Sequence, residues 1–273
     1  MRTLSSVGRR YGIGGPWVLR GVGLELPAGS LVRVEGTNGT GKSTLLRLLA
    51  GIDTPTEGQA LGRPRTAYVP ERFPAALPFT AAGYVTHLGR IHGLSRRTAA
   101  TRAGEWLERF GAGAHARTPL AELSKGTSQK VAAAQALVAA PELLVLDEAW
   151  TGLDTPARAE LDRAVAERVA DGAAVVFVDH DPRRLADAVD TRYAVERGGL
   201  VRRTEAEHSA VSPLVRVDVV GPVPPEGLPG APELTSGPDG AHTLTVAAAH
   251  SDALLRALLT ARPPWHIRRV SRP

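Results

Sequence analysis

The chain of 273 residues has no cysteine. It therefore forms no disulfide and no thiolate metal site, which fits a reducing compartment. It also lacks an apolar run of about 18 residues, the length that a membrane-spanning helix needs. The nearest candidate, residues 131–146, is interrupted by Gln135, Pro141 and Glu142, and the first ten residues hold no apolar core of signal-peptide length. These absences predict a chain that is soluble by itself and needs a partner for any work in a membrane.

Lysine is also scarce, since only Lys42, Lys125 and Lys130 among the 33 basic residues are lysines. The formal net charge is +5, and nucleic-acid binding is one explanation for such a charge. However, the charges are spread along the chain and no block of one sign forms a binding stripe, so we expect no direct nucleic-acid partner. A retained lysine among so many arginines indicates a site where a compact ammonium group fits and a guanidinium group does not.

The strongest motif is GTNGTGKST at residues 36–44, which matches the phosphate-binding loop pattern GxxxxGK[ST]. The mostly apolar residues 31–34 predict a short buried strand before it, and the leucine-rich residues 45–49 predict a helix that ends at Gly51. Backbone N–H groups and the helix N-terminus then surround an anion. In this arrangement Lys42 reaches the β- and γ-phosphates of ATP, and Ser43 is a ligand of Mg²⁺. The other candidate nucleotide-binding residues of the loop are Gly36, Asn38, Gly39, Gly41 and Thr44.

A second motif, LLVLDE, occupies residues 143–148. The apolar run predicts a central parallel strand, and the acidic pair follows at its carboxyl end, where open α/β sheets bind ligands. We expect Asp147 to hold Mg²⁺ and Glu148 to act as general base toward the attacking water. Adjacent side chains on a strand point to opposite faces, so both acids reach one site only because the strand ends here.

The third motif, LSKGTSQK at residues 123–130, shortly precedes the acidic strand. It predicts a helix capped by Ser124, with Val131, Ala134 and Leu137 on its apolar side. Such an N-terminus suits a phosphate group, although the motif taken alone also fits an ordinary capped helix. In this order and spacing, the three motifs resemble those of the ATP-binding cassette (ABC) ATPases. The resemblance covers about residues 2–200.

The resemblance implies further site residues. Tyr11 is similar to the aromatic residue that stacks on adenine, although it also fits a partly buried surface tyrosine. Asp154 resembles the residue of a loop that couples two active sites, and His180 resembles the switch histidine that contacts the γ-phosphate. In the family, Ser124 and Gly126 of the signature would face the nucleotide held by a second copy of the subunit.

One position departs from the family pattern. The family usually has glutamine after the strand that ends here near residues 68–70, whereas this chain has Glu71. A carboxylate can also bind Mg²⁺, but it brings a negative charge toward the triphosphate. We expect this charge to weaken ATP binding or to alter the coupling between hydrolysis and the partner.

The resemblance implies an α/β fold of the P-loop ABC ATPase type over residues 1–208. It comprises a mostly parallel core sheet, an antiparallel β subdomain and an inserted helical subdomain at about residues 72–140. Helices are expected at residues 81–93 and 96–110. Several apolar side chains of this stretch fit either the core of the subdomain or a groove that binds a cytoplasmic helix of a membrane subunit. These side chains are Phe73, Pro74, Leu77, Phe79 and Tyr84.

The sequence of residues 214–273 predicts that they form a small α+β appendix. We expect strands at residues 244–246 and 265–270, and a helix at residues 251–259 capped by Ser251 or Asp252. In pattern this appendix is similar to those on the ATPase subunits of some bacterial drug and antibiotic exporters.

The resemblance further implies an ATPase that uses ATP and Mg²⁺, and pairs with a second copy of itself or a similar cassette. A transmembrane permease would hold it at the inner face of the cell membrane, in the cytoplasm, and export is the expected function. Two alternatives stay open, namely a soluble ABC ATPase acting on a nucleic acid or ribosome, and a nucleotide-gated subunit without catalysis. Residues 45–123 lack the sustained heptads of a chromosome-type coiled coil, and the presence of Glu148 and His180 disfavours a non-catalytic subunit.

Overall fold

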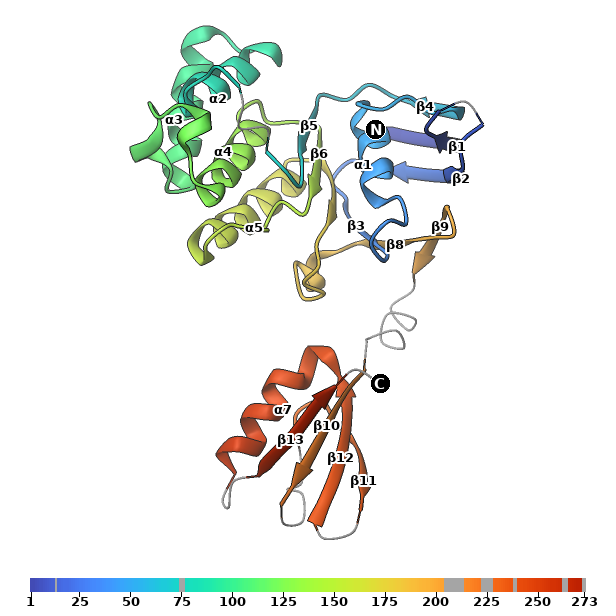
Figure 1. Ribbon diagram of the computed structural model, residues 1–273. Helices are drawn as coiled ribbons and strands as arrows, with labels where there is room; N and C mark the ends of the chain where they lie inside the picture. The colour runs from blue at the N-terminus through green and yellow to red at the C-terminus, as the bar shows by residue number, and fades with distance from the viewer. Residues whose placement is uncertain are drawn as a thin grey trace. The chain divides into compact units, whose positions relative to one another are not determined.

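The computed structural model describes residues 1–12, 14–73, 77–203, 214–221, 228–237, 240–261 and 265–271. The chain divides into two compact units, Met1–Arg203 and Thr204–Pro273 (Figure 1). Pro74 and residues 209–213, which join the two expected domains, lie outside the described residues.

A six-stranded sheet forms the centre of the first unit. Its strands, in spatial order, are β5 (Thr66–Val69), β6 (Leu143–Asp147), β7 (Ala174–Val178), β3 (Leu31–Glu35), β8 (Thr191–Glu196) and β9 (Gly199–Arg203). Neighbouring strands are parallel except at the edge, where β9 is antiparallel to β8. Strands β6 and β7 are buried at every position because other elements cover both faces of the sheet. The mostly parallel core sheet predicted from the sequence is therefore confirmed.

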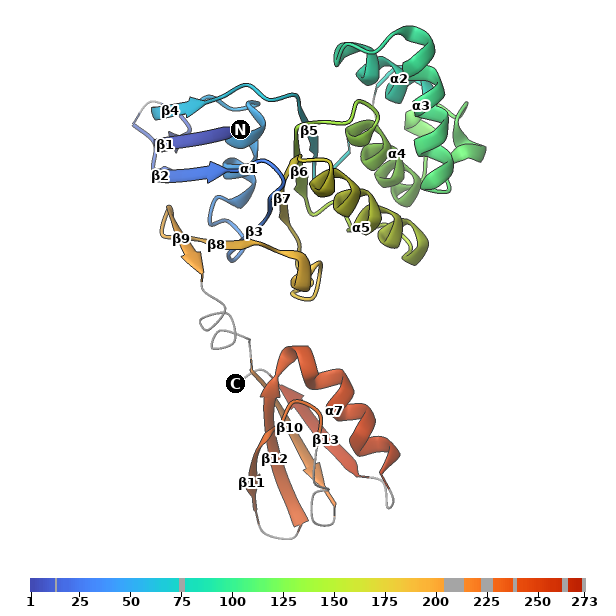
Figure 2. The ribbon, with the colours of Figure 1, turned by 180° about the vertical axis from the view of Figure 1, so that it is seen from behind.

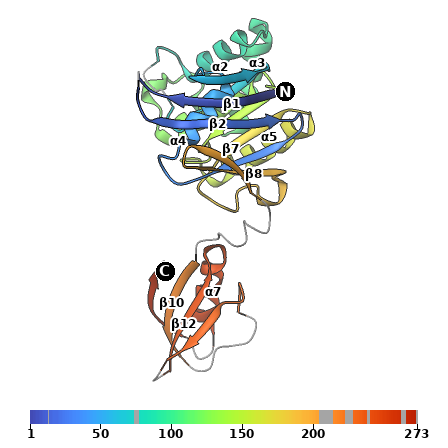
Figure 3. The ribbon, with the colours of Figure 1, turned by 90° about the vertical axis from the view of Figure 1, so that its right-hand side faces the viewer.

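One face of this sheet is covered by helix α1 (Lys42–Ala50) and by a three-stranded antiparallel sheet. The order in that second sheet is β2 (Trp17–Leu26), β1 (Arg2–Arg10), β4 (Glu57–Leu61), and Figure 3 shows β1 and β2 side by side. The leucines of α1 pack in one apolar cluster with side chains from both sheets. Helix α1 ends at Gly51, which adopts a left-handed conformation (φ 73°), as the sequence predicts.

Helices α4 (Lys125–Leu137) and α5 (Thr155–Ala170) lie against the opposite face, and α2 (Ala81–Ile91) and α3 (Arg96–Arg109) pack on α4 (Figures 1 and 2). Short 3₁₀ helices occupy Gly113–His115, Leu120–Glu122 and Ala186–Ala188. The expected groove residues Phe73, Leu77, Phe79 and Tyr84 are partly buried and pack against the helical core. Within the described ranges, none of the helices combines the length and apolarity needed to span a bilayer.

The second unit contains a four-stranded antiparallel sheet and one helix. The strand order is β11 (Glu233–Ser236), β12 (Ala241–Ala247), β10 (Leu214–Val220), β13 (His266–Ser271), and α7 (Ala248–Thr260) packs on the sheet through a core that includes Leu254, Leu258 and Trp265. The predicted cap is wrong, because α7 begins at Ala248. The Ser251 hydroxyl lies inside the helix and donates to the Ala248 carbonyl (2.8 Å).

Candidate functional site

Four strands of the central sheet deliver the sequence motifs to one edge. Strand β3 leads into the phosphate loop, β5 into Glu71, β6 into the acidic pair, and β7 into His180. These strands are parallel neighbours in the order β5-β6-β7-β3. Their carboxyl ends therefore meet at the same edge, which is where open α/β sheets bind ligands.

The phosphate loop depends on glycine at its two ends. Gly36 and Gly41 have φ values of 143° and 106°, which L side chains rarely adopt. A Cβ at Gly36 would lie 2.8 Å from the Thr40 Oγ1 atom and 2.9 Å from the Val195 carbonyl oxygen. Helix α1 starts directly after Gly41, and no side chain in the described part of the chain caps its first turn. The backbone N–H groups of that turn are therefore oriented to bind an anion.

The charged and hydroxyl groups of the loop lie close to the acidic strand. Lys42 is buried, and its Nζ atom donates to the carbonyl oxygens of Gly36 (2.7 Å) and Thr37 (3.0 Å). The Ser43 hydroxyl donates to the Asp147 carboxylate. Thr44 is buried in α1, whereas Asn38 and Gly39 are exposed at the tip of the loop.

Asp147 is 3% exposed and receives a second donor that sequence reasoning missed. The Tyr68 hydroxyl on β5 donates to Asp147 Oδ2 (3.0 Å). Burial raises the pKa of Asp147, and the hydrogen bonds from Tyr68 and Ser43 oppose that rise. Burial and the nearby carboxylate also raise the pKa of Tyr68 well above its ordinary value, so the phenol stays a neutral donor. The sequence offers one indication of this role, the alternation of side chains along β5. Ala67 and Val69 are buried on one face of the strand, so Tyr68 between them lies on the other face.

The oxygen groups at this edge fit Mg²⁺. Asp147 offers a buried carboxylate, Ser43 a hydroxyl group, and the half-exposed Glu71 is close enough to raise the pKa of Asp147 by charge repulsion. Mg²⁺ in nucleotide sites usually takes one or two protein oxygens and fills its remaining positions with water and phosphate oxygens. Accordingly, no group of three His, Cys, Asp or Glu side chains in the described ranges would hold a metal by itself.

Glu148 reaches the same edge through an unusual backbone conformation. Strand β6 ends at Asp147, and Glu148 has a φ of 53°, while its N–H group donates to the Val178 carbonyl (3.0 Å). A left-handed conformation costs about 1–2 kcal/mol for a residue with a side chain, and such strain is concentrated at functional sites. The conformation brings Glu148 Oε1 to 2.7 Å from His180 Nε2. The Glu148 side chain is 15% exposed and the His180 side chain 62% exposed.

Tyr11 lies beside the start of α1 and is anchored through its hydroxyl group. It accepts a hydrogen bond from Arg47 (2.7 Å) and donates to Asp53 (3.0 Å), and the same oxygen lies 3.3 Å from Thr44 Oγ1. The Arg9 guanidinium covers the ring at 4.7 Å from its centroid. Because the residue is still 45% exposed, the ring has surface left on which a flat base can stack.

The signature motif forms a second cluster with the loop before α5. Ser124 caps α4 as predicted, since its Oγ accepts from the Thr127 N–H group (3.1 Å). A Cβ on Gly126 would lie 3.1 Å from the Gly152 carbonyl oxygen. Lys130 Nζ lies 2.6 Å from Asp154 Oδ2, and this contact is the main reason that the pKa of Asp154 is lowered. Across the described residues, no hydrogen bond or ion pair joins this cluster to the phosphate loop.

The chain is similar to known proteins of one family. A family model described as "ABC transporter" matches residues 19–151. The zinc import ATP-binding protein ZnuC of Cereibacter sphaeroides is 40% identical over 185 residues, which cover 66% of this chain and 73% of that protein. The ZnuC protein of Chromohalobacter salexigens is 35% identical over 222 residues, covering 79% and 89% of the two chains. The aliphatic sulfonates import ATP-binding protein SsuB of Pseudomonas putida is 37% identical over 200 residues, covering 71% and 73%.

Among solved structures, a dimeric post-hydrolysis state of the ATP-binding cassette MJ0796 bound to ADP and Pi matches with a TM-score of 0.66 and 25% identity. The match covers 75% of this chain and 98% of that one.

Proposed function

The chain belongs to the ATP-binding cassette family of transporter ATPases, and we propose that it hydrolyses ATP at this sheet edge to drive a membrane permease. The observation that carries the site assignment is the contact between Glu148 and His180 (2.7 Å) at the strand end that also holds Asp147. A carboxylate beside an imidazole at this edge suits proton transfer from an attacking water.

In the proposed reaction the phosphate loop binds the triphosphate through its backbone N–H groups, and Lys42 neutralises charge on the β- and γ-phosphates. The carboxylate of Glu148 orients a water molecule and accepts its proton as the water oxygen bonds to the γ-phosphorus. The bond from that phosphorus to the bridging oxygen breaks, which gives ADP and phosphate. Bound Mg²⁺, held by Asp147 and Ser43, would supply positive charge to the phosphate oxygens.

Two copies of the chain, or one copy and a similar cassette, are proposed to close around the nucleotide. Support comes from the placement of the two motifs within one chain, because α4, which Ser124 caps, packs in one apolar cluster, whereas α1, which follows the phosphate loop, packs in another. The cap of α4 leaves a helix N-terminus that suits a γ-phosphate presented by another subunit. The similar structure of a dimeric cassette also supports this arrangement.

Two candidate functions, import and export, differ in the direction of transport. The relatives that match over most of their length carry names of import subunits, for zinc and for aliphatic sulfonates, and these names favour import. Export, the direction expected from the sequence, is the second candidate, and the C-terminal α+β unit is the feature that favours it. In either direction the permease would hold the chain at the inner face of the membrane.

The test is reconstitution with any membrane protein that is found to be encoded beside this gene. The complex is placed in lipid vesicles, with the cassette and ATP on the inside, and radiolabelled Zn²⁺ serves as the first transport probe. We expect the permease to change the rate of ATP hydrolysis in wild type, and Glu148→Gln to cut hydrolysis about 10²-fold or more. Accumulation of the probe would indicate import and its loss would indicate export. A rate of hydrolysis that no neighbouring membrane protein alters would contradict the coupling.

A further inference from the structure

Strand β3 places a charged side chain in the interior of the first unit. Arg33 is 3% exposed and lies on the strand between β7 and β8. A buried guanidinium group is costly unless its donors and its charge are matched by fixed partners. Strand positions of this kind are normally apolar, so the partners of Arg33 identify what its charge is used for.

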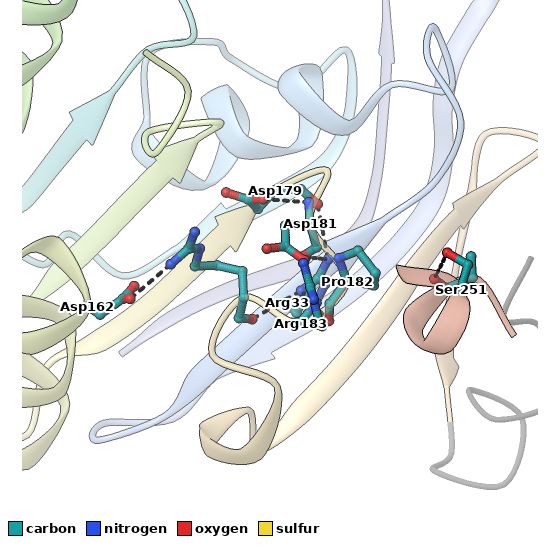
Figure 4. Close-up of polar contacts among 9 residues, drawn as sticks. Arg33, Asp162, Asp179, Asp181, Pro182, Arg183 and Ser251 are labelled. Atoms are coloured by element: carbon teal, nitrogen blue, oxygen red, sulfur yellow. Dashed lines mark hydrogen bonds and ion pairs between the residues drawn. The ribbon is translucent and has the colours of Figure 1, made fainter. Parts of the chain in front are cut away.

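The Arg33 guanidinium holds a single turn of the chain (Figure 4). One terminal nitrogen donates to the carbonyl oxygens of Pro182 (3.3 Å) and Arg184 (3.1 Å). The other donates to the carbonyl oxygens of Asp179 and Asp181, both at 3.0 Å. All four acceptors belong to residues 179–184, the turn that directly follows β7.

The charge of Arg33 is partly offset on its own strand by Glu35, a carboxylate that Arg33 shares with Arg192. The Arg33 Nε atom lies 2.9 Å from Glu35 Oε1, and its guanidinium carbon lies 5.5 Å from the centroid of the Phe177 ring. The turn is also braced internally, because the Asp179 carboxylate accepts the Asp181 N–H (2.6 Å). Arg33 therefore attaches an already ordered turn to the central sheet.

The held turn carries His180, which lies between two of the residues whose carbonyls Arg33 binds. The imidazole is 62% exposed, so packing contributes little to its orientation, yet its Nε2 atom lies 2.7 Å from Glu148 Oε1. We propose that Arg33 is a positioning residue for His180: its guanidinium fixes the carbonyls on both sides of the histidine and so holds the imidazole against Glu148. This inference rests on the proposed roles of Glu148 and His180 in hydrolysis.

The position of Arg33 also connects the turn with the phosphate loop. Arg33 is followed by Val34, Glu35 and then Gly36, the first residue of the loop. One side chain thus fixes the spacing between the strand that enters the loop and the turn that carries the histidine. Small errors in such spacing strongly lower the rate of catalysis, because reacting groups must be held within a fraction of an ångström.

A purely structural role for Arg33 makes a different prediction, and Arg33→Met separates the two. Methionine is unbranched and apolar, so it fills much of the same space without donors or charge. Arg2→Met is the matched control, because Arg2 is also buried (9% exposed) and donates to two backbone carbonyls, those of Gly62 and Leu48. Those two carbonyls lie outside the motifs at the nucleotide edge.

The measurement is ATP turnover by the full chain, with kcat and KM determined separately. We expect Arg33→Met to lower kcat about tenfold or more, with the KM for ATP changed less than about twofold, and Arg2→Met to leave both near wild type. If Arg33 acts through His180, its effect disappears once the histidine is gone. Arg33→Met should therefore lower kcat by less than about twofold in a His180→Ala background.

A second readout is independent of turnover. In protein labelled with ¹³C at histidine, the His180 imidazole signal is identified as the one that His180→Ala removes. We expect that signal to shift and broaden in Arg33→Met and to stay unchanged in Arg2→Met. Arg33→Lys serves if the methionine variant does not fold, because an ammonium group keeps the charge but cannot reach all four carbonyls, and it should displace the same signal.

Unchanged kcat and an unchanged His180 signal in the Arg33 variants would overturn the proposal, and so would an equal loss of kcat in the wild-type and His180→Ala backgrounds. If His180→Ala alone turned over like wild type, the assigned role of His180 would be wrong. The Arg33 proposal would then fall with it.

Discussion

Replacing Tyr68 by phenylalanine removes one atom from the candidate site, the hydroxyl that donates to Asp147 Oδ2 at 3.0 Å. Hydrogen bonds to charged groups contribute about 1.5–3 kcal/mol. The acceptor is 3% exposed, but Tyr68 is only partly buried, so water can replace some of the lost donation. We therefore expect Tyr68→Phe to lower the free energy of unfolding by about 1–2 kcal/mol, and a first unit of this size loses about 2–4 °C in Tm per kcal/mol.

The assay is thermal and urea unfolding of the full chain, with Tyr193→Phe as the matched control. Tyr193 also lies on a strand of the central sheet and is partly buried, but its hydroxyl has no hydrogen-bond partner among the described residues. The control should change stability by less than about 0.5 kcal/mol, as substitutions away from such contacts usually do. Combining Tyr68→Phe with Asp147→Asn should cost less than the sum of the two changes, because the charged acceptor is gone. Equal losses for Tyr68→Phe and Tyr193→Phe would refute the assignment of Tyr68 as a donor to the acidic strand.

Three further predictions concern charged residues of the two clusters. Glu148→Gln should keep ATP binding but cut hydrolysis about 10²-fold or more, whereas Lys42→Ala should weaken ATP binding itself; equilibrium binding and turnover assays compare them. Glu71→Gln should leave nucleotide affinity unchanged or tighten it, because a negative charge near the triphosphate is removed, and loss of binding would count against this reasoning. Lys130→Met should raise the pKa of Asp154 toward its ordinary value in an NMR titration. The stabilisation from this ion pair is present above the ordinary pKa of aspartate and is lost as the pH falls through the lowered pKa.

Elements beside the motifs could be predicted because local sequence determines them. The apolar run at residues 143–146 produced β6, which is buried at every position. Ser124 caps α4 because a hydroxyl at that position satisfies a free N–H group of the first turn. These features depend on residues that are close together in the chain, so a single sequence contains the information needed to predict them.

The C-terminal unit was harder to predict for physical reasons. Strand β11 is exposed at all four positions, so it has no alternation of apolar and polar residues that would indicate a strand. Helix α7 begins with two alanines ahead of Ser251, and alanine has the highest helix propensity. The helix therefore extends past the residues that looked like its cap.

The contacts that shape the candidate site could not be predicted. Tyr68 and Asp147 lie 79 positions apart in the sequence, and Arg33 binds carbonyls almost 150 positions away. A hydrogen bond between distant groups leaves no periodic pattern in a sequence. The left-handed conformation of Glu148 likewise follows from how β6 ends beside β7, since its N–H group donates to the Val178 carbonyl.

ATP is proposed to join two copies of the chain through Ser124 of one and the phosphate loop of the other. Light scattering of Glu148→Gln, with ATP, with ADP and without nucleotide, tests it most directly. We predict a monomer without nucleotide or with ADP, and a dimer with ATP, because only the γ-phosphate supplies contacts to both subunits. Adding Ser124→Arg should abolish that dimer while ATP still binds to each monomer. A dimer of equal strength in all three conditions, or an ATP-dependent dimer that survives Ser124→Arg, would show that the two copies do not close around ATP through Ser124.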